Sequence, residues 1–354
     1  MRALVTGATA EVGMTEAAMP DWGKRVAPAS TIAGQAVNRR WRRSEHRPTR
    51  TKGSAKGAST MEHRVGGQLP DGISIGHWTD AEGRTGCTVI LAPDGAVGGV
   101  DVRGAAPATL GTDALRPATL IERAHGVLLT GGSAFGLDAA GGILRYLEER
   151  GAGYALGSVA VPIVAGAVIF DLLVGDPMAR PNGEAGYAAC EAATRTPEMG
   201  TVGAGTGASV AKAGDGSQER PGGVGIASAQ ADGAIVAAVM VVNSVGGIWD
   251  DEHHDWVAPL TRWDHASNLV PGANTTIGIV VTDAELSKEQ ANRVATVAHD
   301  GIARAIRPAH TMYDGDTIFC LATGTVAAAY DAVEVVAAEV VARAIAVGVT
   351  AAQR

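Results

Sequence analysis

The sequence is poor in cysteine, in aromatic residues and in long apolar runs. Its 354 residues include three cysteines, and none of them stands in a Cys-x-x-Cys pair. An odd number of widely spaced cysteines argues against a disulfide framework. We therefore expect Cys87, Cys190 and Cys320 to be buried free thiols in a reducing compartment. Because aromatic residues make up only 4% of the chain, the core must consist mainly of Ala, Val, Ile and Leu.

Uninterrupted apolar segments are short as well. A membrane-spanning helix needs about 20 consecutive apolar residues. Residues 159–174 come nearest to this length, but a proline and an aspartate interrupt them. With a hydrophobic fraction of 46% and a charged fraction of 19%, the composition is globular. The sequence therefore predicts a globular protein with no membrane partner.

Excess positive charge and zinc-binding motifs are also missing. The net charge of −8 is not typical of a protein that binds nucleic acid. The nine histidines form no His-Glu-x-x-His motif, and the adjacent His253 and His254 would point apart on regular structure. The sequence thus predicts no metal, no cofactor and no nucleic-acid partner.

Residues 1–60 differ in composition from the rest of the chain. They contain eleven Lys or Arg against four Asp or Glu, and few apolar residues. Such a segment cannot bury enough apolar surface to order itself, so we expect a basic, disordered extension. No apolar stretch follows the arginines at 39–43, which argues against an export signal and favours a cytoplasmic protein. Met61 is a candidate natural start, and 61–354 then form one catalytic domain.

From Gly72 onward, strand and helix patterns alternate. Short β-branched runs bounded by glycine predict strands, and amphipathic stretches predict helices. Neighbouring strand pairs mixed with helices favour a layered α/β fold with sheets at its centre. The expected strands are 73–77, 86–91, 98–103, 126–130, 159–173 (for the most part), 223–228, 234–243 and 316–323, and the expected helices are 143–150, 184–193, 287–306 and 330–347. Residues 244–273 are expected to be a long irregular loop.

One further stretch, 271–283, has the sequence PGANTTIGIVVTD. Turn residues followed by an apolar β-branched run predict a loop that enters a buried strand. Thr275 would lie at the start of that strand, where the sheet fixes its backbone and one end of the strand is exposed. A threonine hydroxyl needs an adjacent base to act as a nucleophile, and a chain-terminal threonine carries one in its own amine. Thr275 would acquire that amine only by cleavage of the Asn274–Thr275 bond. The alternative is that Thr275 and Thr276 simply favour the strand.

Four further polar positions lie beside apolar strands or in glycine-rich turns. They are Lys212 in GASVAKAGDG, Asn243 in VMVVNSVGG, and Asp314 and Asp316 in YDGDT. Taken singly, each has a simpler explanation: a surface lysine, a strand-end turn residue and a solvated acidic turn. The residue types alone leave these alternatives open.

Taken together, these blocks resemble the self-processing aminopeptidase family, which includes the L-aminopeptidase/D-esterases, the β-peptidyl aminopeptidases and the nylon-oligomer (6-aminohexanoate-oligomer) hydrolases. The resemblance extends from about Asp71 to the C-terminus. It includes GCTVILAPDGAVGGVDVRGAAPAT, LLTGGSAFGLDAAGGI, VPIVAGAVIFDL, NTTIGIV and RPAHTMYDGDTIF. The DGDT arrangement looks like that of the nylon-oligomer hydrolase branch.

The resemblance implies a four-layer α/β/β/α sandwich, similar to N-terminal-nucleophile hydrolases but with different connectivity. It also implies self-cleavage between Asn274 and Thr275, which would give an α chain of 61–274 and a β chain of 275–354. Thr275 would then be the nucleophile that forms an acyl-threonine intermediate. Lys212 would tune its amine, and Asn243 would donate to the oxyanion.

The same resemblance implies that Asp314 and Asp316 orient the lysine, the threonine amine or a substrate ammonium. It further implies a homo-oligomer, often a tetramer of αβ pairs, that acts on short peptides or amide oligomers. One position departs from the family: where members often have a tyrosine, this chain has Phe170. Phe170 and Thr276 are therefore interpreted only as possible pocket residues.

Two other functions remain open. Acyl transfer of the ornithine acetyltransferase type would use the same fold and the same self-cleavage. A processed assembly without catalytic activity would be consistent with Phe170.

Overall fold

The computed structural model describes residues 64–65, 67–213, 216–260 and 272–354. The predicted extension, residues 1–60, lies outside the described residues. The strands are β1 (Arg64–Val65), β2 (Ser74–Asp80), β3 (Thr85–Val102), β4 (Thr109–Leu110), β5 (Arg123–Thr130), β6 (Tyr154–Leu156), β7 (Val159–Val161), β8 (Val164–Val168), β9 (Ser209–Val210), β10 (Arg220–Pro221), β11 (Gly223–Ala231), β12 (Ala234–Asn243), β13 (Gly247–Asp250), β14 (Asp255–Ala258), β15 (Thr275–Ala284), β16 (Ile306–Arg307) and β17 (Thr317–Val326). The helices are α1 (Thr112–Leu115), α2 (Ala139–Glu148), α3 (Gly183–Glu191), α4 (Lys288–Ala305) and α5 (Tyr330–Ala352), with 3-10 turns η1 (Ser133–Asp138) and η2 (Gly203–Gly205).

The main sheet has the strand order β1-β11-β12-β15-β17-β3-β5-β8-β4, and β2 also pairs with β3. Neighbours are antiparallel except for the β15–β17 and β5–β8 pairs, which are parallel. Strand β3 is 18 residues long and belongs to both halves of the sheet. Its register with β5 shifts between Leu91 and Ala96, at a β-bulge. Bulges bend a strand, which lets β3 pass from one half of the sheet to the other.

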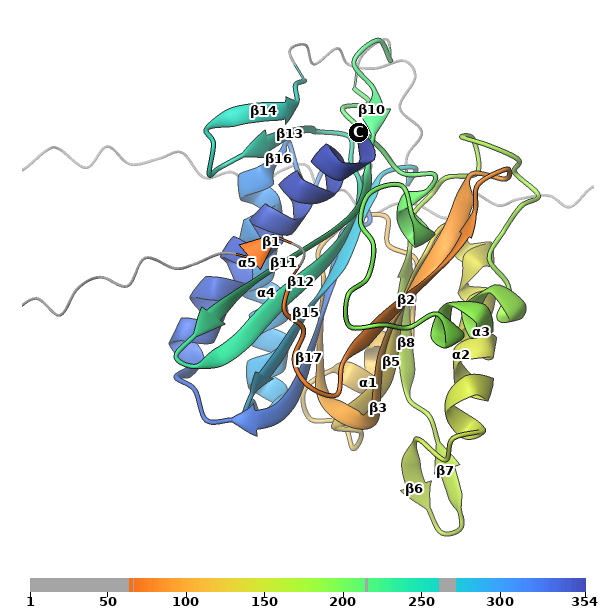
Figure 1. Cartoon of the computed structure of the whole chain (residues 1–354), viewed down its shortest axis with the longest axis vertical. Helices are drawn as coiled ribbons and strands as arrows, with labels where there is room; N and C mark the ends of the chain where they lie inside the picture. Colours follow the sequence, from red (N-terminus) through yellow and green to blue (C-terminus); the bar gives the residue numbers. More distant parts are fainter. Residues whose placement is uncertain (1–63, 66, 214–215, 261–271) are drawn as a thin grey trace, which may run out of the picture. The chain divides into compact units, whose positions relative to one another are not determined.

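Three apolar cores separate four layers. Helices α4 and α5 cover one half of the sheet, and α2 and α3 cover the other (Figure 1). On β12, Met240 and Val242 pack toward α4 and α5, whereas Val239 and Val241 pack into the core between the sheet halves. A strand buried on both faces needs the continuous apolar sequence that β12 has. The predicted four-layer α/β/β/α sandwich is confirmed.

Three local predictions were wrong. The strands expected at 86–91 and 98–103 are one strand, β3, because Gly95 adopts a φ of 76° and the pairing resumes at Ala96. The strand expected over 159–173 is split into β7 and β8. The loop expected over 244–273 contains the β13–β14 hairpin, and part of that loop, residues 261–271, lies outside the described residues.

Helix α5 extends beyond the expected 330–347 to Ala352 and is rich in alanine and valine. Among the described helices it is the one whose length and hydropathy would allow it to cross a membrane. Its apolar residues, such as Val340 and Ile345, are instead buried in the core that also contains α4 and β12. Such burial is typical of the central helix of a globular domain. All three cysteines are also buried and free, as predicted.

Candidate active site

The sheet topology brings the ends of three strands together. Strands β12 and β15 are antiparallel, and the last residue of β12, Asn243, lies opposite the first residue of β15, Thr275. Strands β15 and β17 are parallel, so their beginnings share the same edge of the sheet, with Asp316 directly before β17. Residues that are 32 and 41 positions from Thr275 in the sequence are thus its neighbours in space.

Lys212 follows β9 and reaches this edge from a separate segment. Its backbone N–H donates to the Val245 carbonyl at 3.1 Å. Its Nζ donates to Asn243 Oδ1 at 2.7 Å and lies 3.4 Å from the carbonyl oxygen of Ala273. Burial lowers the pKa of Lys212 to about 8, against the opposing effect of nearby carboxylates that include Asp314. A substantial fraction of this amine is therefore neutral near pH 8.

Asn243 is held on both sides of its amide. Its Oδ1 accepts from Lys212 Nζ and from the Ser209 N–H at 3.1 Å. Its Nδ2 donates to the carbonyl oxygens of Phe170 at 3.3 Å and Ala273 at 3.4 Å. Since Lys212 and the Ser209 backbone can only donate here, the orientation of the amide is determined. The Asn243 Nδ2 therefore faces the segment that enters β15.

The Thr275 hydroxyl contacts the peptide bond that precedes it. Thr275 is 4% exposed, and its Oγ1 lies 2.5 Å from the carbonyl oxygen of Asn274. The same carbonyl oxygen accepts the Gly315 N–H at 3.0 Å. A Cβ at position 315 would come within 2.6 Å of the Ala106 carbonyl oxygen and 2.9 Å of Thr275 Oγ1. Only glycine therefore fits between these groups without a shift.

The two aspartates have different partners. Asp314 Oδ2 accepts from the N–H and hydroxyl of Thr311, both at 2.7 Å. Burial and the nearby Asp316 raise the pKa of Asp314 to about 6. Asp316 Oδ1 accepts the Thr276 N–H at 2.7 Å, and its Oδ2 accepts from His310 Nδ1 at 2.7 Å. Asp316 thus holds the backbone directly after Thr275, a contact that the sequence did not predict.

The two residues interpreted as possible pocket residues lie beside this cluster. Thr276 is buried, and its Oγ1 has no hydrogen-bond partner among the described residues. Phe170 is partly exposed, and its carbonyl oxygen accepts from Asn243. The contribution of Phe170 to the cluster is therefore a backbone group, which any residue type would provide.

Asp171 is a buried carboxylate that the sequence analysis did not single out. It is 4% exposed and accepts from Thr85 Oγ1 at 2.7 Å and from the Gly132 N–H at 2.6 Å. Burial raises its pKa, and it interacts electrostatically with Lys212. The sequence could have identified Asp171, because it is a single acidic residue directly after the apolar run 163–170. An acid in such a position is usually buried and hydrogen-bonded.

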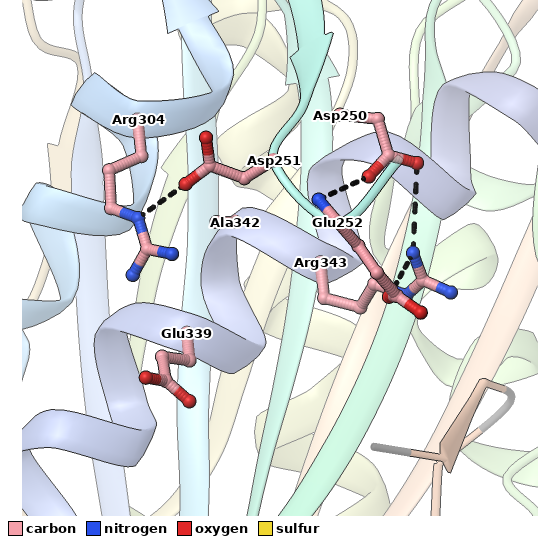
Figure 2. A pocket seen from close by; sticks show the side chains of 7 residues that line it. All are labelled: Asp250, Asp251, Glu252, Arg304, Glu339, Ala342 and Arg343. Carbon is pink, nitrogen blue, oxygen red and sulfur yellow. Dashed lines mark hydrogen bonds and ion pairs between the residues drawn. The ribbon is translucent and has the colours of Figure 1, made fainter. Parts of the chain in front are cut away.

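A separate cavity of about 220 Å³ lies between the β13–β14 turn and helices α4 and α5 (Figure 2). Two ion-paired groups occupy its wall: Arg304 with Asp251 at 2.8 Å, and Arg343 with Glu252 at 2.5 Å. None of the residues that line it belongs to the Thr275 cluster. Arg343 also lies 3.6 Å from Asp250, and the four carboxylates of the lining outnumber its two arginines. We assign this cavity no chemistry.

Residues 71–354 match the model of peptidase family S58. The chain is a member of peptidase family S58. This places it among hydrolases of peptide and amide bonds, and it confirms the resemblance inferred from the sequence motifs.

Relatives within this family carry related activities in their names. An uncharacterized aminopeptidase of Mycobacterium leprae is 45% identical, in an alignment that covers 73% of this chain and 78% of that protein. A 6-aminohexanoate-oligomer endohydrolase of Kocuria sp. is 33% identical, in an alignment that covers 71% of this chain and 73% of that protein.

Solved structures share the fold. A β-aminopeptidase of Burkholderia sp. has a TM-score of 0.63 at 24% identity, over 83% of this chain and 89% of that one. The L-aminopeptidase D-Ala-esterase/amidase of Ochrobactrum anthropi, described as a variant of the Ntn hydrolase fold, has a TM-score of 0.63 at 19% identity. That alignment covers 80% of this chain and 85% of that one.

Proposed function

We propose that this S58 peptidase cleaves itself between Asn274 and Thr275 and then uses Thr275 as an N-terminal nucleophile that hydrolyses amide bonds. The observation that carries this proposal is the contact between the Thr275 hydroxyl and the carbonyl group of the bond to be cut. Lys212 Nζ and Asn243 Nδ2 both contact the carbonyl oxygen of Ala273, the residue before Asn274. Catalytic groups are thereby gathered around one peptide bond.

In the self-cleavage step, Thr275 Oγ attacks the carbonyl carbon of Asn274. The Gly315 N–H, 3.0 Å from the carbonyl oxygen, is positioned to stabilise the negative charge that develops there. As the bond between the Asn274 carbonyl carbon and the Thr275 nitrogen breaks, that nitrogen takes up the proton that the hydroxyl loses, and an ester between Asn274 and Thr275 Oγ remains. Water hydrolyses this ester, which gives an α-carboxylate on Asn274 and restores the Thr275 hydroxyl beside the amine that is now free.

In the amidase step, the new amine accepts the proton of the Thr275 hydroxyl as that hydroxyl attacks a substrate amide. The amine product leaves, and water releases the acyl group from Thr275. Before cleavage, Asn243 Nδ2 donates to the Ala273 carbonyl oxygen. Once the new C-terminus moves away, this donor is free for the oxyanion of the substrate. Lys212, whose pKa burial lowers, adjusts the charge beside the threonine amine.

The names of the relatives define the substrate class that we propose. An aminopeptidase and a 6-aminohexanoate-oligomer endohydrolase are both similar to this chain, so short peptides or short amide oligomers are the proposed substrates. We further propose a cytoplasmic homo-oligomer, a tetramer of αβ pairs, with residues 61–354 as the catalytic domain.

Intact-mass measurement of the purified chain tests the proposal. Wild type is expected to give two polypeptides, the second beginning with TTIGIV, whereas Thr275→Val is expected to remain one chain without amidase activity. Valine has nearly the shape of threonine but lacks the hydroxyl. The matched control is Thr282→Val, which lies farther along the same buried strand and should still be cut.

Each other outcome has a definite meaning. A wild-type chain that hydrolyses amides while uncut would refute the N-terminal-nucleophile mechanism. A cut chain that transfers acyl groups to an amine faster than to water would favour acyl transfer of the ornithine acetyltransferase type. A cut chain with no turnover on amide or ester substrates would indicate a non-catalytic assembly.

A further inference from the structure

His310 connects the core of the protein to the backbone of the proposed nucleophile. Its Nδ1 lies 2.7 Å from Asp316 Oδ2, and its backbone N–H donates to the same oxygen at 3.3 Å. The other oxygen of Asp316 accepts the Thr276 N–H at 2.7 Å. Asp316 is 2% exposed, so both of its oxygens are fixed by protein groups away from water. The chain of contacts thus runs from His310 through Asp316 to the residue after Thr275.

The ring of His310 is itself held in place. It packs edge-to-face against the ring of His299, with centroids 5.0 Å apart. His299, on α4, is fully buried, and its Nε2 lies 3.1 Å from the carbonyl oxygen of Asp101. A carbonyl oxygen only accepts, so His299 Nε2 carries a proton. Burial lowers the pKa of His299 to about 4, which keeps that ring neutral. Likewise, a carboxylate partner requires a proton on His310 Nδ1.

The backbone of His310 gives no reason for a histidine. Its φ is 54°, in the left-handed region, where glycine and asparagine are more easily accommodated than other residues. If the turn alone mattered, glycine would be at least as suitable as histidine. The contact between the ring and Asp316 is the feature that requires this side chain.

We propose that His310 is a positioning residue, which fixes the Asp316 carboxylate so that Asp316 anchors Thr276 and hence the nucleophile Thr275. This inference rests on the proposed function. After cleavage, Thr275 becomes the first residue of a strand, and chain ends fray unless they are tied down. The Thr276 N–H is the nearest backbone donor behind it. The contact between Asp316 and the Thr276 N–H therefore matters more for turnover by the cleaved enzyme than for self-cleavage. During self-cleavage the chain still continues on both sides of Thr275 and holds it in place.

Three substitutions of His310 distinguish the effect of its side-chain donor to Asp316 from the effect of its left-handed backbone. His310→Gly removes the donor and relieves the left-handed backbone. His310→Asn keeps a donor near the position of Nδ1 and tolerates a positive φ. His310→Asp is nearly isosteric with the asparagine variant but presents an oxygen to Asp316. Each variant is purified as the full chain, its cut fraction is measured by intact mass, and kcat and KM are measured per cut chain on a short amide oligomer.

We expect kcat to fall at least about tenfold in His310→Gly and His310→Asp. KM should be nearly unchanged, because the His310 ring contacts Asp316 and His299 and acts on Thr275 only through Asp316 and Thr276. His310→Asn should recover most of the wild-type kcat. If all three variants retain the wild-type kcat, or if asparagine is as defective as aspartate, the inference is wrong. Should the glycine variant fail to fold, the asparagine and aspartate pair decides by itself. A wild-type chain that is never cut would instead refute the proposed function, and this inference with it.

Discussion

Asn243→Ala tests the proposed oxyanion donor most directly. The substitution removes the Nδ2 group that donates to the carbonyl oxygens of Phe170 and Ala273 in the uncut chain. It also removes the acceptor of the Lys212 ammonium and of the Ser209 N–H. The variant therefore combines a loss of transition-state stabilisation with a loss of local hydrogen bonding, and these two effects can be measured separately.

The expected magnitudes follow from the two effects. Removal of one oxyanion donor typically lowers kcat by about 10²–10³, or about 3–4 kcal/mol of transition-state stabilisation. Leaving a buried donor such as the Ser209 N–H without a partner costs about 1–3 kcal/mol of folding free energy. We therefore expect Asn243→Ala to unfold at a lower temperature and, in the fraction that is cut, to turn over about 10²–10³ times more slowly.

The assay counts cut chains by intact mass and expresses kcat per cut chain, so that slow self-cleavage is not mistaken for slow turnover. Asn182→Ala is the matched control. The Asn182 side chain caps helix α3 by accepting the Ala185 N–H at 3.0 Å, and its loss should lower stability but leave kcat unchanged. A kcat for the cut Asn243→Ala enzyme within about threefold of wild type would refute the oxyanion role.

Two further predictions concern stability. Because burial lowers the folded-state pKa of Lys212 from 10.5 to about 8, the charged lysine destabilises the fold below pH 8, and this cost disappears as the pH rises toward 10.5. We therefore expect Lys212→Met, made in the uncut Thr275→Val background, to raise the midpoint of thermal unfolding at pH 7 and to raise it less at pH 10. An equal rise at pH 7 and pH 10 would contradict a lowered pKa of Lys212. Ser287→Ala removes the capping box that Ser287 and Gln290 form at the start of α4. It should lower the free energy of unfolding by about 1 kcal/mol without slowing self-cleavage. An unchanged free energy of unfolding would show that the capping box contributes nothing to stability.

Sequence patterns determined the layers because burial follows from local composition. Strand β12 is apolar on both faces up to Asn243, and so is the middle of β15, residues 277–281, in a strand whose ten residues are all buried. Strands of this kind must lie between two cores, which is what a sandwich with helices outside and sheets inside provides. The family motifs also placed Lys212, Asn243, Thr275, Asp314 and Asp316 in one group, and the fold brings all five to one edge of the sheet.

Only the tertiary structure decided which of these groups touch. Lys212 and Asn243 form a hydrogen bond although they are 31 residues apart in the sequence. His310 contacts Asp316 because its backbone adopts a left-handed conformation, which the periodicity of the sequence does not predict. Hydrogen bonds between separate segments depend on strand register and loop path, whereas composition sets only which surfaces are buried. For the same reason the continuity of β3 and the β13–β14 hairpin were missed. The sequence by itself determined what is inside this protein, and the tertiary structure determined what lies next to Thr275.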